Sequence, residues 1–206
     1  MPNLFVISGA NGAGKSTLSK IILPEEFSNL EVFDGDKFFV ESLMKIFPAQ
    51  IKSPKYARDM AFQKTVSEFE RLVEKNIISN SSFAYEGHFS SESPWQTIIR
   101  FREMDYHITM IFLMVSDLSL SLKRVSERVK TGGHYVTPQE IEKNFYGNLF
   151  QLNKHFQLID ELIIADNSTF GTPSQILRVS EGKITESIEK NIMPNWVKQY
   201  LYNLIQ

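Results

Sequence analysis

A glycine-rich segment near the start of the chain has the residue types and spacing of a phosphate-binding loop. Residues 9–16 are Gly-Ala-Asn-Gly-Ala-Gly-Lys-Ser, which fits G-x-x-x-x-G-K-[ST], and they stand between an apolar run and a segment expected to be helical. Glycines let successive backbone N–H groups turn toward phosphate oxygens, and the helix N-terminus adds partial positive charge. We therefore predict binding of a nucleoside triphosphate, with Lys15 at the β- and γ-phosphates and the Ser16 hydroxyl on Mg²⁺. The expected nucleotide-binding residues are Gly9, Ala10, Asn11, Gly12, Ala13, Gly14, Lys15, Ser16 and Thr17.

Several classes of nucleotide-binding protein share such a loop, and other motifs separate them. ABC-type ATPases carry a Leu-Ser-Gly-Gly-Gln signature and GTPases an Asn-Lys-x-Asp motif that recognises the base, and neither occurs in this sequence. A small-molecule kinase requires neither motif. The sequence therefore favours a kinase that uses ATP.

Acidic residues follow two of the apolar runs. Asp34 and Asp36 come directly after the second run, where a carboxylate beside a phosphate loop would meet an acceptor hydroxyl and take its proton. The alternative is a simple turn around Gly35. Glu86 ends the third run, with His88 two residues later. If that strand neighbours the first, Glu86 faces Mg²⁺ or the substrate, and His88 is expected on the substrate side as well; the alternative for Glu86 is a solvated strand end.

A basic helix followed by two glycines predicts a lid at about residues 124–138. Arg124 and Arg128 are four residues apart, so they share one helix face, and the glycines at 132–133 provide a hinge. Such a lid closes on ATP, excludes water and neutralises charge on the transferred phosphoryl group. The alternative is a surface helix whose arginines pair with Glu127 or with solvent.

The elements that would position these residues alternate along the chain. Apolar runs rich in β-branched and aromatic residues predict buried strands, and stretches with a period of 3.6 residues predict helices. The expected strands are 4–7, 31–33, 82–85, 108–115 and 162–164; the expected helices are 57–73, 117–130, 137–156 and 195–205, with a hairpin at 176–184. This order predicts an α/β fold in three layers, with a mainly parallel five-stranded sheet flanked by helices, a helical lid, and a C-terminal hairpin plus helix. We expect one domain over residues 1–206.

Composition excludes several other classes of protein. The 206 residues carry 22 Lys and Arg against 24 Asp and Glu, so the formal charge is −2, which argues against a nucleic-acid or membrane-surface binder. The absence of cysteine excludes disulfides, zinc–thiolate sites and cysteine nucleophiles, and with only four histidines no transition-metal site is expected; His134 is assigned a structural hydrogen bond. The longest apolar run, 110–115, is far shorter than the roughly 20 residues of a membrane span, and no signal peptide is evident. We expect a cytoplasmic protein.

These segments together resemble the zeta-toxin-like kinases, a group of P-loop small-molecule kinases, over roughly residues 4–185. The resemblance rests on the phosphate loop, the Asp-x-Asp and Glu-Gly after the second and third strands, Arg-Val-x-x-Arg-Val-x-x-Gly-Gly-His-x-Val at 124–136, and Asp-Asn-Ser at 166–168. It implies ATP- and Mg²⁺-dependent phosphorylation of a hydroxyl of a nucleotide sugar, for which UDP-N-acetylglucosamine is the best known acceptor.

The resemblance also implies roles for individual residues. Lys15 would be the phosphate lysine and Asp36 the general base, with Asp34 as second choice. Arg124 and Arg128 would be the transition-state arginines of the lid. Three further residues have implied contacts: Ser16 with Mg²⁺, Glu86 with the substrate, and Asn167 with the adenine.

One segment departs from the family pattern. Many relatives carry paired arginines on the helix after the lid, whereas residues 141–148 contain Lys143 as their only cation. Lysine cannot reproduce the bidentate fork of arginine, so the acceptor could instead be a nucleoside, an antibiotic or another small alcohol. The rival hypothesis is an ATP-binding regulatory or interaction module without useful transfer. Relatives also suggest a protein antitoxin as a partner.

Overall fold

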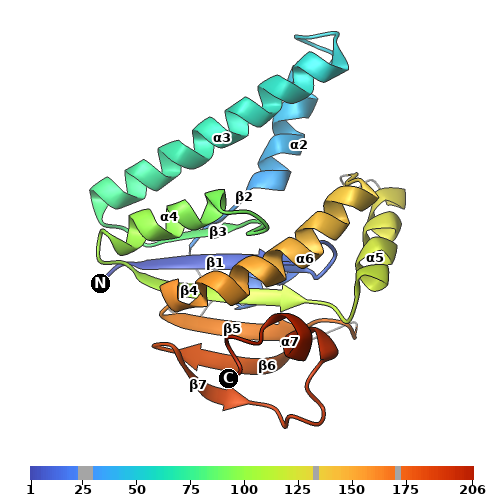
Figure 1. Cartoon of the computed structure of the whole chain (residues 1–206). Helices are drawn as coiled ribbons and strands as arrows, with labels where there is room; N and C mark the ends of the chain where they lie inside the picture. The colour runs from blue at the N-terminus through green and yellow to red at the C-terminus, as the bar shows by residue number, and fades with distance from the viewer. Residues whose placement is uncertain (23–29, 132–134, 170–172) are drawn as a thin grey trace.

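The computed structural model describes residues 1–22, 30–131, 135–169 and 173–206 (Figure 1). The expected hinge at 132–133 and His134 therefore lie outside the described residues. In the part of the chain that is described, no helix is both long enough and apolar enough to cross a membrane.

The described residues form a seven-stranded sheet in the order β2-β3-β1-β4-β5-β6-β7. The first five strands in this order are parallel, which confirms the expected mainly parallel α/β sheet. The hairpin continues the same sheet, because β6 pairs antiparallel with β5 and β7 pairs antiparallel with β6. The strands are β1 (Asn3–Gly9), β2 (Val32–Asp34), β3 (Phe83–Glu86), β4 (His107–Met114), β5 (Glu161–Asp166), β6 (Ser174–Ser180) and β7 (Lys183–Ser187).

Helices connect the parallel strands and cover the sheet. They are α1 (Lys15–Ile22), α2 (Gly35–Ile46), α3 (Pro54–Ser79), α4 (Ser93–Arg102), α5 (Leu118–Lys130), α6 (Pro138–His155) and α7 (Asn195–Tyr200), with a 3₁₀ helix at Phe156–Leu158. Neither α2 nor α4 was expected from the sequence. The helix expected at 57–73 is longer than predicted, since it begins at Pro54 and ends at Ser79, and the last helix ends at Tyr200 rather than at residue 205.

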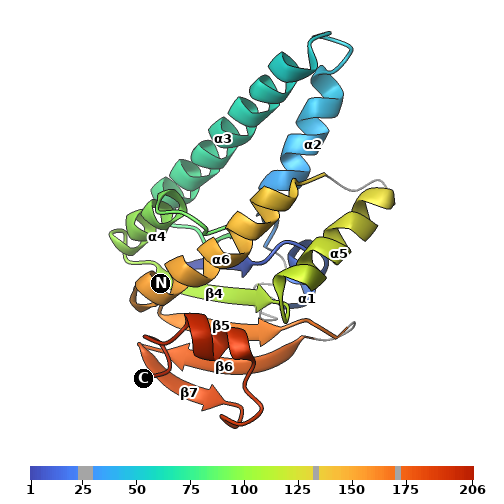
Figure 2. The same cartoon turned by 45° about the vertical axis from the view of Figure 1, so that its right-hand side comes forward.

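Two helix pairs stand over the same end of the sheet. Figures 1 and 2 show α2 and α3 rising away from the sheet, and α5 and the first half of α6 forming a second pair beside them. Aromatic contacts fix α3 to the strands below, because the Phe69 ring lies 5.7 Å from Phe33 and 5.0 Å from Tyr85 between ring centroids. Since α2 follows β2 and α5 follows β4, the helix pairs flank the carboxyl ends of the parallel strands, where sites in such sheets form.

Central strands of this sheet are buried on both faces. Every residue of β4 from Ile108 to Met114 is buried, as expected for a parallel strand covered by helices. The core is continuous beneath the phosphate loop, because Ala10 and Ala13 of that loop belong to the same buried cluster as β1 and β4.

Candidate active site

The loop between β1 and α1 has the backbone shape that the motif predicts. Gly9, Gly12 and Gly14 have φ values of 128°, 73° and 90°, a region that favours glycine. At Gly9 a Cβ atom would lie 1.8 Å from the carbonyl oxygen of Leu113 on β4. Only glycine fits this position, so the phosphate loop is joined to the central strand without a side chain between them.

Lys15 lies against the loop that contains it. Its Nζ donates hydrogen bonds to the carbonyl oxygens of Gly9 and Ala10, each at 3.1 Å. Burial lowers the pKa of the Lys15 ammonium, and the nearby carboxylates of Glu86 and Asp36 act in the opposite direction. The ammonium is therefore held among backbone carbonyls at the position that the motif assigns to phosphate binding.

Glu86 and Ser16 form the most specific contact of the site. The strand β3 pairs with β1, placing Glu86 opposite Ile7, so the condition set for Glu86 in the sequence is met. The Ser16 hydroxyl donates to Glu86 Oε1 at 2.7 Å, and Glu86 Oε2 is buried without a hydrogen-bond partner among the described residues. Burial raises the pKa of Glu86 to about 7, an effect that the Ser16 hydrogen bond opposes and Asp34 reinforces.

This pair of oxygens fits a magnesium ion. A hydroxyl and a carboxylate with one oxygen free are hard ligands, and Mg²⁺ is usually held by one or two carboxylates together with phosphate oxygens and water. The described residues contain no group of three or more His, Asp or Glu side chains that would hold a metal on their own. The donor set therefore suits a cation that arrives with a nucleotide.

The two aspartates after β2 have different surroundings. Asp34 is the N-cap of α2, and its Oδ1 accepts from the backbone N–H of Lys37 at 2.9 Å. Asp36 lies in the first helical turn with an exposed side chain that lines the cavity of the phosphate loop. The segment around Gly35 is thus a helix start rather than a simple turn, and Asp36 is the one of the two that reaches the cavity.

Arg124 connects the phosphate loop to the segment after β5. Its Nη1 donates to the carbonyl oxygens of Asn167 at 2.7 Å and Gly12 at 3.3 Å, and its Nη2 donates to that of Ser168 at 2.8 Å. Arg128, one turn further along α5, lines the same cavity, as expected from their spacing of four. Arg124 therefore joins the phosphate loop to the segment that follows β5.

Most of the predicted residues line one cavity of about 500 Å³. Segments far apart in the sequence contribute to its wall: the phosphate loop with the start of α1, the start of α2, the end of β3, α5, and the residue that follows β5. Among the predicted residues, Gly9, Ala10, Ala13 and Asp34 are not part of the lining. The lining residues are Asn11, Gly12, Gly14, Lys15, Ser16, Thr17, Leu18, Asp36, Glu86, His88, Arg124, Glu127, Arg128, Thr131 and Asn167.

Two asparagines of α6, which the sequence reasoning missed, support this cavity from behind. Asn148 is fully buried; its Oδ1 accepts from the backbone N–H of Phe89 at 2.6 Å and from the Ser8 hydroxyl at 3.3 Å. Asn144 donates from Nδ2 to Asn11 Oδ1 at 3.1 Å. This segment of α6 therefore carries amides that hold the phosphate loop. Their spacing of four residues was the available signal.

His88 is part of this amide network. Its two ring nitrogens lie 3.2 Å from the side-chain nitrogens of Asn11 and Asn148, respectively. Burial, helped by the charges of Lys15 and Arg128, lowers the pKa of His88 well below its ordinary value, so the ring is neutral near pH 7. His88 lines the cavity as expected, but both of its nitrogens face asparagine amides of the protein.

The helix α6 approaches this network closely at Gly147. A Cβ atom there would lie 2.7 Å from the carbonyl oxygen of Ser90, and the Ser90 hydroxyl donates to Asn144 Oδ1 at 2.9 Å. A glycine within a helix lowers stability by about 1 kcal/mol relative to alanine. The close contact with Ser90 explains why position 147 nevertheless carries glycine.

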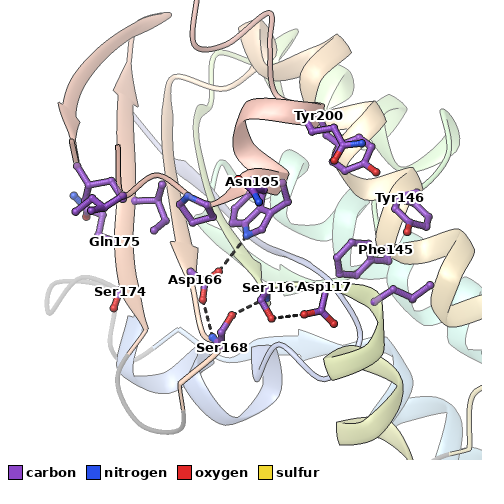
Figure 3. A pocket seen from close by; sticks show the side chains of 17 residues that line it. Ser116, Asp117, Phe145, Tyr146, Asp166, Ser168, Ser174, Gln175, Asn195 and Tyr200 are labelled. Atoms are coloured by element: carbon purple, nitrogen blue, oxygen red, sulfur yellow. Dashed lines mark hydrogen bonds between the residues drawn. The ribbon is translucent and has the colours of Figure 1, made fainter. Parts of the chain in front are cut away.

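A second, larger hollow of about 850 Å³ lies on the other side of residues 166–168 (Figure 3). Asp166 and Ser168 line this hollow, whereas Asn167 between them lines the cavity of the phosphate loop. Trp196 Nε1 donates to Asp166 Oδ2 at 3.1 Å, and the backbone N–H of Ser116 donates to Ser168 Oγ at 2.6 Å. No Lys or Arg is among the described residues that line it, whereas Lys15, Arg124 and Arg128 line the smaller cavity.

Solved structures share this fold. A chain of the AvrRxo1-ORF1:-ORF2 complex crystallised with ATP superposes with a TM-score of 0.70 at 14% identity, over 98% of this chain and 64% of that chain. This chain thus spans less than two thirds of that relative's length. The PezAT chromosomal toxin-antitoxin system of Streptococcus pneumoniae gives a TM-score of 0.58 at 17% identity, over 100% of this chain and 88% of the other. These likenesses show a P-loop kinase fold.

Sequence comparisons identify the family. An uncharacterized protein of Haemophilus influenzae is 27% identical over 138 residues, which is 67% of this chain and 88% of that protein. The zeta toxin family model matches residues 1–170. Because the matched region covers most of the 206 residues and contains the phosphate loop and the strand-end acids, the chain belongs to the zeta toxin family.

Proposed function

We propose that this chain is an ATP- and Mg²⁺-dependent kinase that transfers the γ-phosphoryl group to a hydroxyl of a small molecule. The observation that carries the proposal is the Ser16–Glu86 hydrogen bond with Glu86 Oε2 left unpartnered beside Lys15. A hydroxyl, a carboxylate and an ammonium around one phosphate loop form the donor set that phosphoryl transfer requires.

The residues of the cavity suggest a division of roles. Lys15 neutralises charge on the β- and γ-phosphates, and Ser16 with Glu86 would hold the cation. A cation held there would supply positive charge that stabilises the charge developing on the phosphates. Asp36 accepts the proton of the acceptor hydroxyl while the new oxygen–phosphorus bond forms and the bond to ADP breaks. Arg128 balances charge on the transferred group, and Arg124 keeps the phosphate loop in place, with residues 124–138 as the lid of a single domain.

Family membership favours a nucleotide sugar such as UDP-N-acetylglucosamine as the acceptor. The helix α6 contacts the phosphate loop through asparagines, and residues 141–148 contain Lys143 as their only cation, which favours an acceptor that needs fewer cationic contacts. A nucleoside, an antibiotic or another small alcohol is therefore tested beside the nucleotide sugars.

The test is direct detection of a phosphorylated product. Purified protein is incubated with ATP, Mg²⁺ and each acceptor, and products are identified by mass spectrometry. Asp36→Asn is expected to lower kcat by roughly 100-fold or more, the usual contribution of a general base. Asp59→Asn, at an exposed position on α3, serves as the matched control. Transfer by Asp36→Asn at the wild-type rate would rule out Asp36 as the base.

A second candidate function is an ATP-binding module that changes its protein partner without useful transfer. It is favoured by Arg124, whose guanidinium bonds to three backbone carbonyls in a way that suits structural coupling. The relatives from PezAT and AvrRxo1-ORF1:-ORF2 are described in complexes with partner proteins, so an antitoxin-like protein is a candidate partner. ATP-dependent changes in partner affinity without any phosphorylated product would favour this function.

A further inference from the structure

The second hollow, of about 850 Å³, is lined by aromatic and acidic side chains (Figure 3). Phe145 and Trp196 form buried parts of its wall, whereas Tyr146 is 39% exposed. Asp117 and Asp166 are its two acids, and none of the described residues that line it is Lys, Arg or His. An apolar wall with a few polar groups is typical of a site for a small organic molecule. The hollow therefore has the composition of a binding site, and its charged groups are all negative.

Hydrogen bonds connect the two acids along one wall of the hollow. The backbone N–H of Ser168 donates to Asp166 Oδ1 at 2.8 Å, and the backbone N–H of Ser116 donates to Ser168 Oγ at 2.6 Å. The Ser116 hydroxyl in turn donates to Asp117 Oδ2 at 2.7 Å. Trp196 Nε1 donates to the other oxygen of Asp166 at 3.1 Å. Both carboxylates are therefore held in fixed positions on the same wall.

Neither carboxylate has a counter-ion among the described residues. Hydrogen bonds from neutral groups, first from the Ser119 hydroxyl and the backbone N–H of Leu120, lower the pKa of Asp117 to about 2, so this acid is ionised near pH 7. No ion pair within the described part of the chain includes Asp117 or Asp166. Residues 170–172, which lie outside the described ranges, are Phe-Gly-Thr, so their sequence adds no cation. The uncompensated charge favours a cationic group from outside the chain.

Aromatic rings from two helices meet at the hollow. The ring centroids of Tyr146 on α6 and Tyr200 on α7 are 5.7 Å apart with the planes inclined by 54°, and the Phe145 ring lies 5.2 Å from that of Tyr146. A cation within about 6 Å of the face of a tyrosine ring is attracted by the ring quadrupole. Ile176 and Ile192 add aliphatic surface to the same lining. The hollow thus offers attraction for a positive charge and an apolar surface for the body that carries it.

The second hollow is separate from the cavity of the phosphate loop. The described linings of the two have no residue in common, although Asp166 and Ser168 flank Asn167 of the other cavity. More than half of the lining of the hollow follows residue 170, where the match to the family model ends. The hollow therefore depends on this chain's own hairpin and last helix.

We propose that the second hollow binds an organic amine, a small molecule that joins an ammonium group to a hydrocarbon or aromatic body. The ammonium group pairs with Asp117 and Asp166 and contacts the ring of Tyr146. The body of the molecule packs on Phe145 and Ile176. Anionic ligands are excluded, because the same carboxylates repel them. The inference does not depend on the proposed kinase activity.

NMR titration of the full chain tests the inference through its two tryptophans. The indole N–H of Trp196 lies in the wall of the hollow, whereas Trp95 is fully buried and is not part of the lining. The probes are 2-phenylethylamine, the uncharged 2-phenylethanol and the anion phenylacetate, at about 150 mM NaCl to screen unspecific charge attraction. The amine is expected to shift the Trp196 signal with saturation and to bind roughly 5- to 30-fold more tightly than the alcohol. Phenylacetate is expected to leave both indole signals in place.

Two variants test the assigned contacts. Asp117→Asn removes a charge but keeps the cap of α5, since asparagine caps helices as well as aspartate does. Tyr146→Leu removes an exposed ring and keeps an apolar side chain. Each is expected to weaken amine binding roughly 3- to 10-fold, while Asp59→Asn, at an exposed position on α3, keeps the wild-type affinity. Thermal melting checks folding, and the probe series on the wild type decides the question if a variant does not fold.

Three outcomes overturn the inference. The first is equal binding of the amine and the alcohol by the wild type, or no binding of the amine. The second is an unchanged amine affinity in both Asp117→Asn and Tyr146→Leu. The third is displacement of the amine in proportion to added Mg²⁺ and ATP, which would place it in the cavity of the phosphate loop. Saturation of the Trp196 shift in a protein that transfers no phosphate supports the inference while counting against the kinase proposal, so the two failures are distinguishable.

Discussion

The buried carboxyl of Glu86 makes stability depend on pH in a way that one substitution removes. Burial raises the pKa of Glu86 from an ordinary 4.5 to about 7. The folded state therefore binds more protons than the unfolded state between these values, and stability falls as pH rises through that window. This carboxyl contributes stability below its unfolded pKa and loses that contribution above its folded pKa. Glu86→Gln keeps the shape of the protonated acid and its acceptor for Ser16, but it does not titrate.

The size of the effect follows from the two pKa values. At about 1.4 kcal/mol per pKa unit, the titration of Glu86 removes about 2.5 kcal/mol of unfolding free energy between pH 5 and pH 8. We expect wild type and Glu86→Gln to be similarly stable at pH 5. At pH 8 the variant is expected to be more stable by about 2.5 kcal/mol, because a buried charge is removed from the site.

Urea denaturation at pH 5, 6, 7 and 8, with EDTA present, measures this difference. Glu41→Gln removes a carboxylate from an exposed position on α2 and serves as the control. In a second series at pH 8, Mg²⁺ with a non-hydrolysable ATP analogue is expected to stabilise wild type more than Glu86→Gln, because only the native carboxylate binds the cation. Parallel pH curves for wild type and Glu86→Gln would refute the assignment of Glu86 as a buried, titrating group.

Three further substitutions test the framework of the site. Asn148→Ala leaves several buried polar groups unpaired and is expected to lower the unfolding free energy by about 2–4 kcal/mol, measured by urea denaturation. Gly9→Ala places a Cβ atom against the carbonyl of Leu113 and is expected to prevent stable folding, whereas Gly182→Ala, with nothing within 4 Å, is expected to cost only about 1 kcal/mol; circular dichroism melting compares them. Asp34→Ala removes the N-cap of α2 and is expected to cost about 0.5–2 kcal/mol; a loss of activity far beyond that of Asp36→Asn would contradict its capping role.

Local patterns predicted the parallel core of the fold correctly. Parallel strands buried on both faces appear in the sequence as short apolar runs, and each expected parallel strand is present. The start of α2 was ambiguous because Asp34 followed by Gly35 fits both a turn and a helix N-cap. The hairpin is attached to β5 by an antiparallel pairing of consecutive strands, because β6 begins at Ser174 and β5 ends at Asp166, and this pairing was not predicted from the sequence.

Within the site, the phosphate loop and the strand-end acids could be predicted from the sequence, but the asparagines of α6 that hydrogen-bond to the loop could not. Asn144 and Asn148 lie more than 130 residues from the loop that they contact, so their role depends on how α6 crosses the sheet. Sequence alone also could not separate Asp34 from Asp36, since the difference lies in which carboxylate accepts a backbone N–H. The roles of these residues therefore depend on three-dimensional contacts that their residue types alone do not determine.

The close contact of Gly147 with Ser90 fixes α6 near its middle. The helix of 18 residues is about 27 Å long and passes from the edge of the lid to the back of the phosphate loop. Asn144 lies between the first turns and Gly147, and Asn148 is the direct neighbour of Gly147, so a displacement of the first turns would move Asn144 in the same sense and leave Asn148 nearly in place. A displacement of the first turns of α6 would therefore reach the phosphate loop through the hydrogen bond from Asn144 to Asn11, and a methyl group at position 147 would shift this contact.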